Sequence, residues 1–80
     1  MTATLPRPLV ERLAGFAQFL REHGLTVGPA EQQSMVQASL ALGTTGAQKV
    51  DAAWRAIACG DARQWRQWPE LFERYWYPHR

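Results

Sequence analysis

The sequence contains only one cysteine, Cys59, so no disulfide can form within the chain. Its N-terminus, MTATLPRPLVERL, lacks the positively charged start and the apolar run of a secretory signal. Both observations favour a protein that works in a reducing, cytoplasmic environment. Long apolar runs are also missing, and none approaches the ~20 residues that cross a bilayer, so we expect no membrane span.

Dense positive charge is missing too. The formal net charge is only +2, and most of the basic residues are interleaved with acidic ones. A protein committed to nucleic acid usually carries a concentrated basic cluster, so this composition argues against that class. Five of the nine basic residues nevertheless lie in the last third of the chain, where they favour a locally positive surface: Arg55, Arg63, Arg66, Arg74 and Arg80.

The residues that are present suffice for one folded domain. The hydrophobic fraction of 46 % and the charged fraction of 20 % exclude a disordered chain. The 80 residues can build a single modest core, which buries about 60 % of the surface of the unfolded chain. We expect a flexible N-terminus at 1–7, followed by a single helical domain at 8–80.

Apolar residues recur at three- and four-residue steps, which predicts helices along the chain. The first helix is expected over 8–23 and ends at Gly24, and the second begins at Pro29 and runs to about Leu42. Their apolar faces are formed by Leu9, Leu13, Phe16, Ala17 and Leu20 in the first helix, and by Met35, Val36, Ala38, Leu40 and Leu42 in the second.

A third helix is predicted between two glycine-containing segments. Thr45 can cap its start, Gln48 lies at the spacing of a capping box, and Gly60 stops it. The apolar positions on its inner face are Val50, Trp54 and Ile57. We expect Trp54 to be a core residue.

The C-terminal segment is predicted to be interrupted. Asp61 can cap a short turn, ARQW, and the residue before a proline is disfavoured in α geometry, so Trp68 should mark a boundary. The last helix then begins at Pro69 and packs against the first. The predicted fold class is all-α: a small bundle of four helices, or five if the short turn forms one.

Chemistry-bearing residues do not form a recognisable site. His23 and His79 lack partners at metal-ligand spacing, and a lone helical cysteine such as Cys59 is usually a buried, inert thiol. The carboxylates lie at helical spacing from arginines, which predicts three surface pairs: Asp51 with Arg55, Arg66 with Glu70, and Glu70 with Arg74. We therefore expect no catalytic residues, no metal, no cofactor and no enzyme.

The stretch WRQWPELFERYWY, residues 65–77, holds three of the four tryptophans, both tyrosines and one phenylalanine. With Phe16, Phe19 and Trp54 placed elsewhere, a small domain cannot easily bury all of these rings. Tryptophan and arginine are enriched at interface hot spots. The residues predicted to contact a partner are Arg63, Trp65, Arg66, Trp68 and Tyr77.

Other roles for these aromatics remain open at this point. The rings can belong to the core and its edge, with arginines stacked on them. They can also mediate contact with a second copy of the chain, which makes a stand-alone homo-oligomer an alternative function. Stacking of single-stranded nucleic acid on the rings is a further alternative, although the low net charge counts against it.

Two long segments resemble a known family. The segments FAQFLREHGLTVGPAE at 16–31 and AAWRAIACGDARQWRQWPELFERYWYP at 52–78 are similar to the N-terminal region of CoxE-like proteins. In that family an opening helix ends in a Gly-Leu-x-Val-Gly link. A later alanine-rich helix leads to an LF-x-x-aromatic-Trp element. The resemblance covers nearly the whole chain from Leu9 onward.

The resemblance implies a function. CoxE-like proteins carry a von Willebrand factor A domain further along the chain and are typically encoded with MoxR-type AAA+ ATPases. Such a pair activates metalloenzymes or inserts their cofactors, as for molybdenum-containing carbon monoxide dehydrogenase. The expected role of this segment is noncatalytic docking, with the ATPase, a client metalloenzyme or an absent C-terminal von Willebrand factor A domain as partner. The family's Asp-x-Ser-x-Ser metal motif does not occur in these 80 residues, so no Mg²⁺ site is implied.

Overall fold

The computed structural model describes residues 7–42 and 47–79, and these contain four helices and no strand. The helices are α1 (Arg7–Glu22), α2 (Pro29–Leu42), α3 (Ala47–Ala58) and α4 (Ala62–Trp76). The all-α prediction is therefore confirmed. The predicted flexibility of the N-terminus concerns mainly residues 1–6, and the predicted capping box depends on Thr45 and the side chain of Gln48; both lie outside the described residues.

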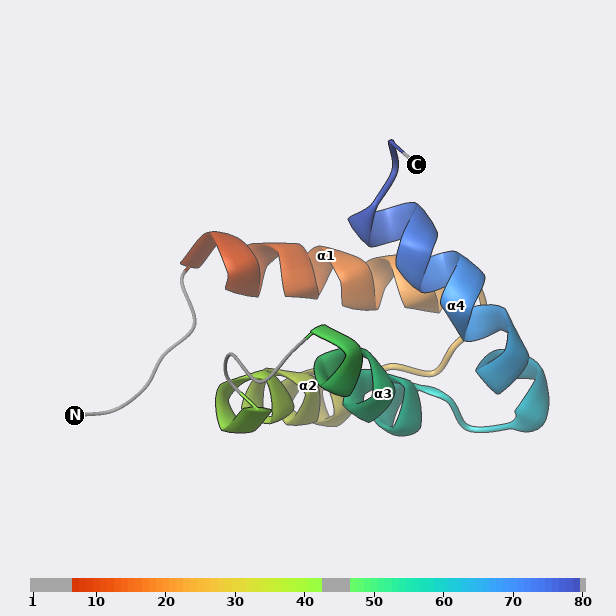
Figure 1. The fold of residues 1–80 in the computed structure, drawn as a ribbon. Helices are drawn as coiled ribbons and strands as arrows, with labels where there is room; N and C mark the ends of the chain where they lie inside the picture. Colours follow the sequence, from red (N-terminus) through yellow and green to blue (C-terminus); the bar gives the residue numbers. More distant parts are fainter. Residues whose placement is uncertain (1–6, 43–46, 80) are drawn as a thin grey trace.

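The helices are arranged around one core (Figure 1). α2 and α3 pack against each other, α1 lies alongside α2, and α4 rises from the end of α3 to pack against α1. This order places the first and last helices of the chain in contact, as predicted. The outward-facing side of α4 lies at one end of the molecule.

The end of α1 is fixed by a glycine. Gly24 has a φ of 90°, in the left-handed region that favours glycine. The N–H of Gly24 donates to the carbonyl of Arg21 at 3.1 Å, and the N–H of Leu25 donates to the carbonyl of Leu20 at 3.0 Å. These two bonds form a Schellman motif. The chain thereby turns sharply, and Leu25 and Leu20 are both buried.

The inner face of α2 is centred on a polar residue that the apolar pattern did not indicate. Ser39 is 8 % exposed and its hydroxyl donates to the carbonyl of Met35 at 3.0 Å. The indole N–H of Trp54 donates to the same carbonyl at 3.0 Å and to the Ser39 hydroxyl at 3.1 Å. Trp54 is 5 % exposed, so it lies in the core as expected and needs these acceptors.

Phe16 lies at the centre of an aromatic core and is fully buried. Its ring centroid is 5.2 to 6.0 Å from those of five other aromatic residues: Trp54, Trp68, Phe72, Tyr75 and Trp76. The expectation that the domain cannot bury every ring of 65–77 agrees with the structure. Trp68 is buried and Phe72, Tyr75 and Trp76 are half-buried, whereas Trp65 and Tyr77 are exposed.

The predicted helix boundary at Trp68 is also wrong, because α4 continues through Pro69. Asp61 starts the helix by accepting a hydrogen bond from the N–H of Gln64 at 2.7 Å. Pro69 has no N–H to donate to the carbonyl of Trp65, four residues earlier. Arg55 replaces that donor: its Nε–H donates to the Trp65 carbonyl at 3.0 Å, and a second guanidinium nitrogen donates to the same oxygen.

Candidate functional site

The five residues predicted to contact a partner do not form one patch. Arg63, Trp65, Arg66 and Tyr77 are exposed, whereas Trp68 is 1 % exposed. Residues two positions apart on a helix point about 160° apart, so Arg63 and Trp65 lie on opposite flanks of α4. Arg63 and Arg66, three residues apart, share a side of the helix, and Trp65 lies on another.

Trp68 is a core residue, and its prediction as a partner contact is wrong. Its ring packs against Phe16 with a centroid distance of 5.4 Å, and its indole N–H donates to Asp51 Oδ1 at 2.6 Å. The sequence contains the signal for this placement. In an unbroken helix, Gln64, Trp68 and Leu71 fall on one side, and all three are buried.

Trp65 is held in place although it is 44 % exposed. The guanidinium carbon of Arg55 lies 4.2 Å from the centroid of the Trp65 ring, within cation–π distance. The same guanidinium donates to the Trp65 carbonyl, as described above. One arginine on α3 thus fixes both the backbone and the ring of Trp65. A large aromatic surface is consequently displayed in a defined orientation.

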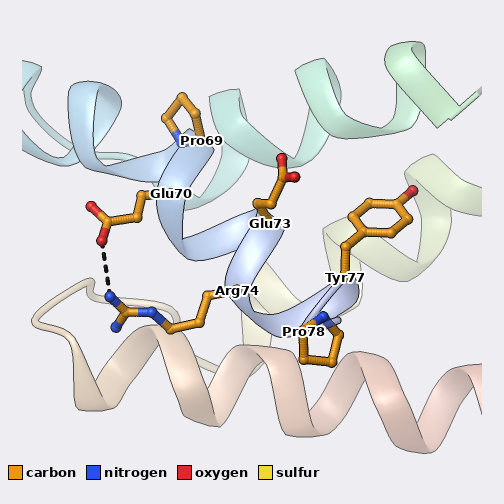
Figure 2. Close-up of a pocket in the computed structure, with 6 residues that line it drawn as sticks. All are labelled: Pro69, Glu70, Glu73, Arg74, Tyr77 and Pro78. Carbon is orange, nitrogen blue, oxygen red and sulfur yellow. Dashed lines mark hydrogen bonds and ion pairs between the residues drawn. The ribbon is translucent and has the colours of Figure 1, made fainter. Parts of the chain in front are cut away.

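The outermost side of α4 carries a second set of residues, which we call the outer stripe. Its members follow one another at steps of three or four residues, so they share one side of the helix: Ala62, Arg66, Pro69 and Glu73, with Tyr77 directly after the helix end. All five are exposed. Figure 2 shows Pro69, Glu73 and Tyr77 in a row along the C-terminal half of this side.

A shallow groove lies beside the C-terminal half of the outer stripe (Figure 2). Its remaining lining residues are Glu70, Arg74 and Pro78. Glu70 and Arg74 form one of the predicted ion pairs, with 2.9 Å between Glu70 Oε1 and an Arg74 guanidinium nitrogen. This part of α4 therefore combines prolines, an aromatic ring and two carboxylates.

The charges on α4 are mixed along the helix. Arg63 and Arg66 lie in its first half, and Glu70, Glu73 and Arg74 lie in its second half. A helix is stabilised by negative charge near its N-terminus and positive charge near its C-terminus. Asp61 at the N-cap and Arg74 in the last turn agree with this rule, whereas Arg63, Arg66 and Glu73 do not.

Two of the three predicted carboxylate–arginine pairs differ in the structure. Glu70 forms its ion pair with Arg74 and not with Arg66. Asp51 was expected to pair with Arg55, but Asp51 accepts the indole N–H of Trp68 and Arg55 donates to the Trp65 carbonyl. Both side chains connect α3 to α4. They are therefore positioned by the folded core, and they do not form the expected surface pair.

The remaining reactive groups are engaged or deactivated. Burial raises the pKa of the Cys59 thiol, more than the nearby Arg55 lowers it. The thiol is therefore protonated at neutral pH and is a weak nucleophile. His23 Nδ1 lies 2.8 Å from the Phe19 carbonyl, to which it donates in the matching tautomer. Within 7–42 and 47–79 no three metal-ligating side chains cluster.

These features define a class: a small all-α bundle with an aromatic core and a last helix whose exposed side carries both positive and negative charges. The model of a family described as the CoxE N-terminal helical bundle domain matches residues 13–79. The chain belongs to this family, and the resemblance drawn from the sequence is confirmed. No curated protein and no solved structure matches the chain. In the described part of the chain, no helix has the length and apolarity to cross a membrane.

Proposed function

We propose that this domain is a noncatalytic docking module that works with a MoxR-type AAA+ ATPase in activating a metalloenzyme or inserting its cofactor. Membership of the CoxE N-terminal family supports this role. The observation that carries it is the exposed Trp65, fixed at backbone and ring by Arg55. A partner that consumes ATP would place the domain in the cytoplasm.

Preorganisation is the physical reason for giving Trp65 this role. Binding costs the conformational entropy of every side chain that becomes ordered at the interface. The Trp65 ring is already held by Arg55, so little of that cost remains when a partner covers it. Arg66 lies next to it in sequence and adds a donor on the exposed side of α4. Trp65 and Arg66 are therefore the proposed anchors of the docking surface.

The noncatalytic part of the proposal is supported by how the two buried polar side chains, Gln64 and Ser39, are used. Gln64 Oε1 accepts the Gly60 N–H at 2.6 Å, and its amide donates to the Gly24 carbonyl at 3.4 Å. The Ser39 hydroxyl is engaged by the indole of Trp54. These groups satisfy the fold's own hydrogen bonds.

The test is direct binding between this chain and a purified MoxR-type AAA+ ATPase, measured by calorimetry with ATP and with ADP. Trp65→Ala should weaken binding by at least about tenfold, since a hot-spot tryptophan contributes about 2 kcal/mol or more. Leu9→Ala is the matched control, because Leu9 is also exposed, at 36 %, but lies on α1. Equal affinity for wild type and Trp65→Ala would reject the docking surface.

The resemblance also implies a client metalloenzyme and a von Willebrand factor A domain as partners. The same two variants test each of them in turn. If the ATPase does not bind wild type but one of the other two does, and Trp65→Ala weakens that contact, the surface is correct and the assigned partner is wrong.

A further inference from the structure

The outer stripe of α4 has a symmetry that the proposed function does not require. Read along the helix, it presents a small residue, a positive charge, a proline, a negative charge and an aromatic ring: Ala62, Arg66, Pro69, Glu73 and Tyr77. Arg66 precedes Pro69 by three residues and Glu73 follows it by four. Ala62 and Tyr77 lie seven residues before and eight residues after the proline. The spacing is thus nearly symmetric about Pro69, whereas charge and size are opposite on its two sides.

We propose that the outer stripe binds a second copy of this chain, with the two α4 helices antiparallel and Pro69 near the two-fold axis. A two-fold interface is self-complementary, so a contact from residue i to residue j is repeated from j to i. Antiparallel pairing about Pro69 brings Arg66 of each copy opposite Glu73 of the other. It also places the small Ala62 opposite the large Tyr77.

Charge complementarity is the reason to choose a second copy over a nucleic acid. A nucleic-acid backbone laid along α4 would contact Arg63 and Arg66 and then meet Glu70 and Glu73. The segment from Arg66 to Glu70 rises only about 6 Å along the helix axis, so the reversal of charge is abrupt. In an antiparallel pair of outer stripes, by contrast, Arg66 of each copy lies opposite Glu73 of the other, so opposite charges meet twice.

The face is small, which sets the expected strength. One helix face buries less than the ~800 Å² per partner of a standard stable interface. We therefore expect a weak, reversible dimer with a dissociation constant on the order of 100 µM. This association does not depend on the ATPase, although it would cover Arg66 and so compete with the docking surface.

Sedimentation equilibrium of the 80-residue chain tests the proposal over a concentration range around that value. The apparent mass should rise from 9.1 kDa toward twice that value. Arg66→Glu and Glu73→Arg, each alone, should weaken dimerisation at least about tenfold, because each brings like charges together twice in a two-fold pair. An equimolar mixture of the two variants should restore wild-type association, since both cross-pairs regain opposite charges.

Matched controls are available on α1. Arg7→Glu and Glu11→Arg make the same charge changes at side chains that are 90 % and 67 % exposed, and they should leave association unchanged. Circular dichroism of each variant confirms that it is folded. A monomer at every concentration would overturn the proposal, as would variants that dimerise as wild type does or a mixture that fails to restore association. An apparent dimer that disappears after nuclease treatment would point to nucleic acid and would overturn it equally.

Discussion

The inner and outer faces of α4 differ in how their polar atoms are used. On the inner face, Gln64 donates to the link after α1 and Trp68 donates to Asp51 on α3. Near the end of the same helix, the hydroxyl of Tyr75 donates to the Arg12 carbonyl of α1 at 2.7 Å. The outer stripe, in contrast, displays opposite charges on both sides of Pro69. The three inward bonds fix α4 to the rest of the bundle, and this fixes the outer face as a rigid surface.

The largest expected effect comes from a substitution on the inner face of α4. Trp68→Ala should lower the free energy of unfolding by about 3 to 5 kcal/mol, as for other buried aromatic residues. The loss combines a cavity beside Phe16 with a carboxylate, Asp51, that no longer receives the indole N–H. Urea unfolding followed by circular dichroism measures this change.

Trp65→Ala is the matched control for this experiment. It makes the same substitution three residues earlier in the same helix, on an exposed ring. We expect a loss of about 1 kcal/mol at most, from the stacking of Arg55. Comparable losses for the two tryptophans would show that the two faces are not distinct.

The close approach of α1 and α4 gives the second effect. A Cβ added at Gly15 would lie 2.5 Å from the hydroxyl oxygen of Tyr75. Gly15→Ala should therefore destabilise the domain by about 1 to 3 kcal/mol through overpacking, although alanine favours a helix over glycine. Thermal unfolding checks this value.

A second variant separates the steric contact from the helix preference. In a Tyr75→Phe background the hydroxyl is gone, so Gly15→Ala should be neutral or stabilising. Tyr75→Phe alone should cost about 1 kcal/mol, for the lost hydrogen bond to the Arg12 carbonyl. If Gly15→Ala is equally harmful in both backgrounds, the hydroxyl is not the cause.

Arg55 connects the two faces, and its removal gives the third effect. Arg55→Ala should cost about 1 to 2 kcal/mol, because the Trp65 carbonyl loses its donors and the ring loses its cation. Pro69→Ala supplies the missing intrahelical N–H. The effect of Arg55→Ala should therefore be smaller in the Pro69→Ala background, as a double-mutant cycle of urea unfolding would show. Strict additivity would mean that Arg55 does not replace the missing donor.

The same contact explains why the sequence predicted three helices well and the fourth poorly. The ends of the first three helices depend on neighbouring residues such as Gly24 and Pro29, which can be recognised locally. The continuity of α4 depends on Arg55, which lies ten residues before the carbonyl it binds. No local pattern contains that donor. The expected break at Pro69 then hid the helical spacing that would have placed Trp68 with Leu71 on the buried side.

The buried face of α2 shows a second limit of the sequence. Ser39 is polar, so a prediction from the spacing of apolar residues placed its neighbours, and not Ser39, on the inner side of α2. Its burial depends on the indole N–H of Trp54, fifteen residues later in the chain. The exposed residues of the candidate site were easier to predict. Arginine and tryptophan at helical spacing indicate a recognition surface, but only the packed helix shows which ring remains outside.

The smallest expected effect tests the outer face itself. The double change of Trp65→Ala and Arg66→Ala should leave the melting temperature nearly unchanged, because both side chains are exposed and neither fills the core. We expect a loss of about 1 kcal/mol or less, which shifts the melting temperature of a domain of this size by no more than several degrees. Differential scanning calorimetry gives the value.

The double variant also determines whether the position of α4 depends on the exposed residues Trp65 and Arg66. If its near-ultraviolet circular dichroism retains the signals of the buried tryptophans, the inner face alone holds α4 in place. The surface is then free to vary in sequence while its position stays fixed. If the double change melts the domain, Trp65 and its contact with Arg55 are needed for folding, and Trp65 must be counted with the inner face of α4.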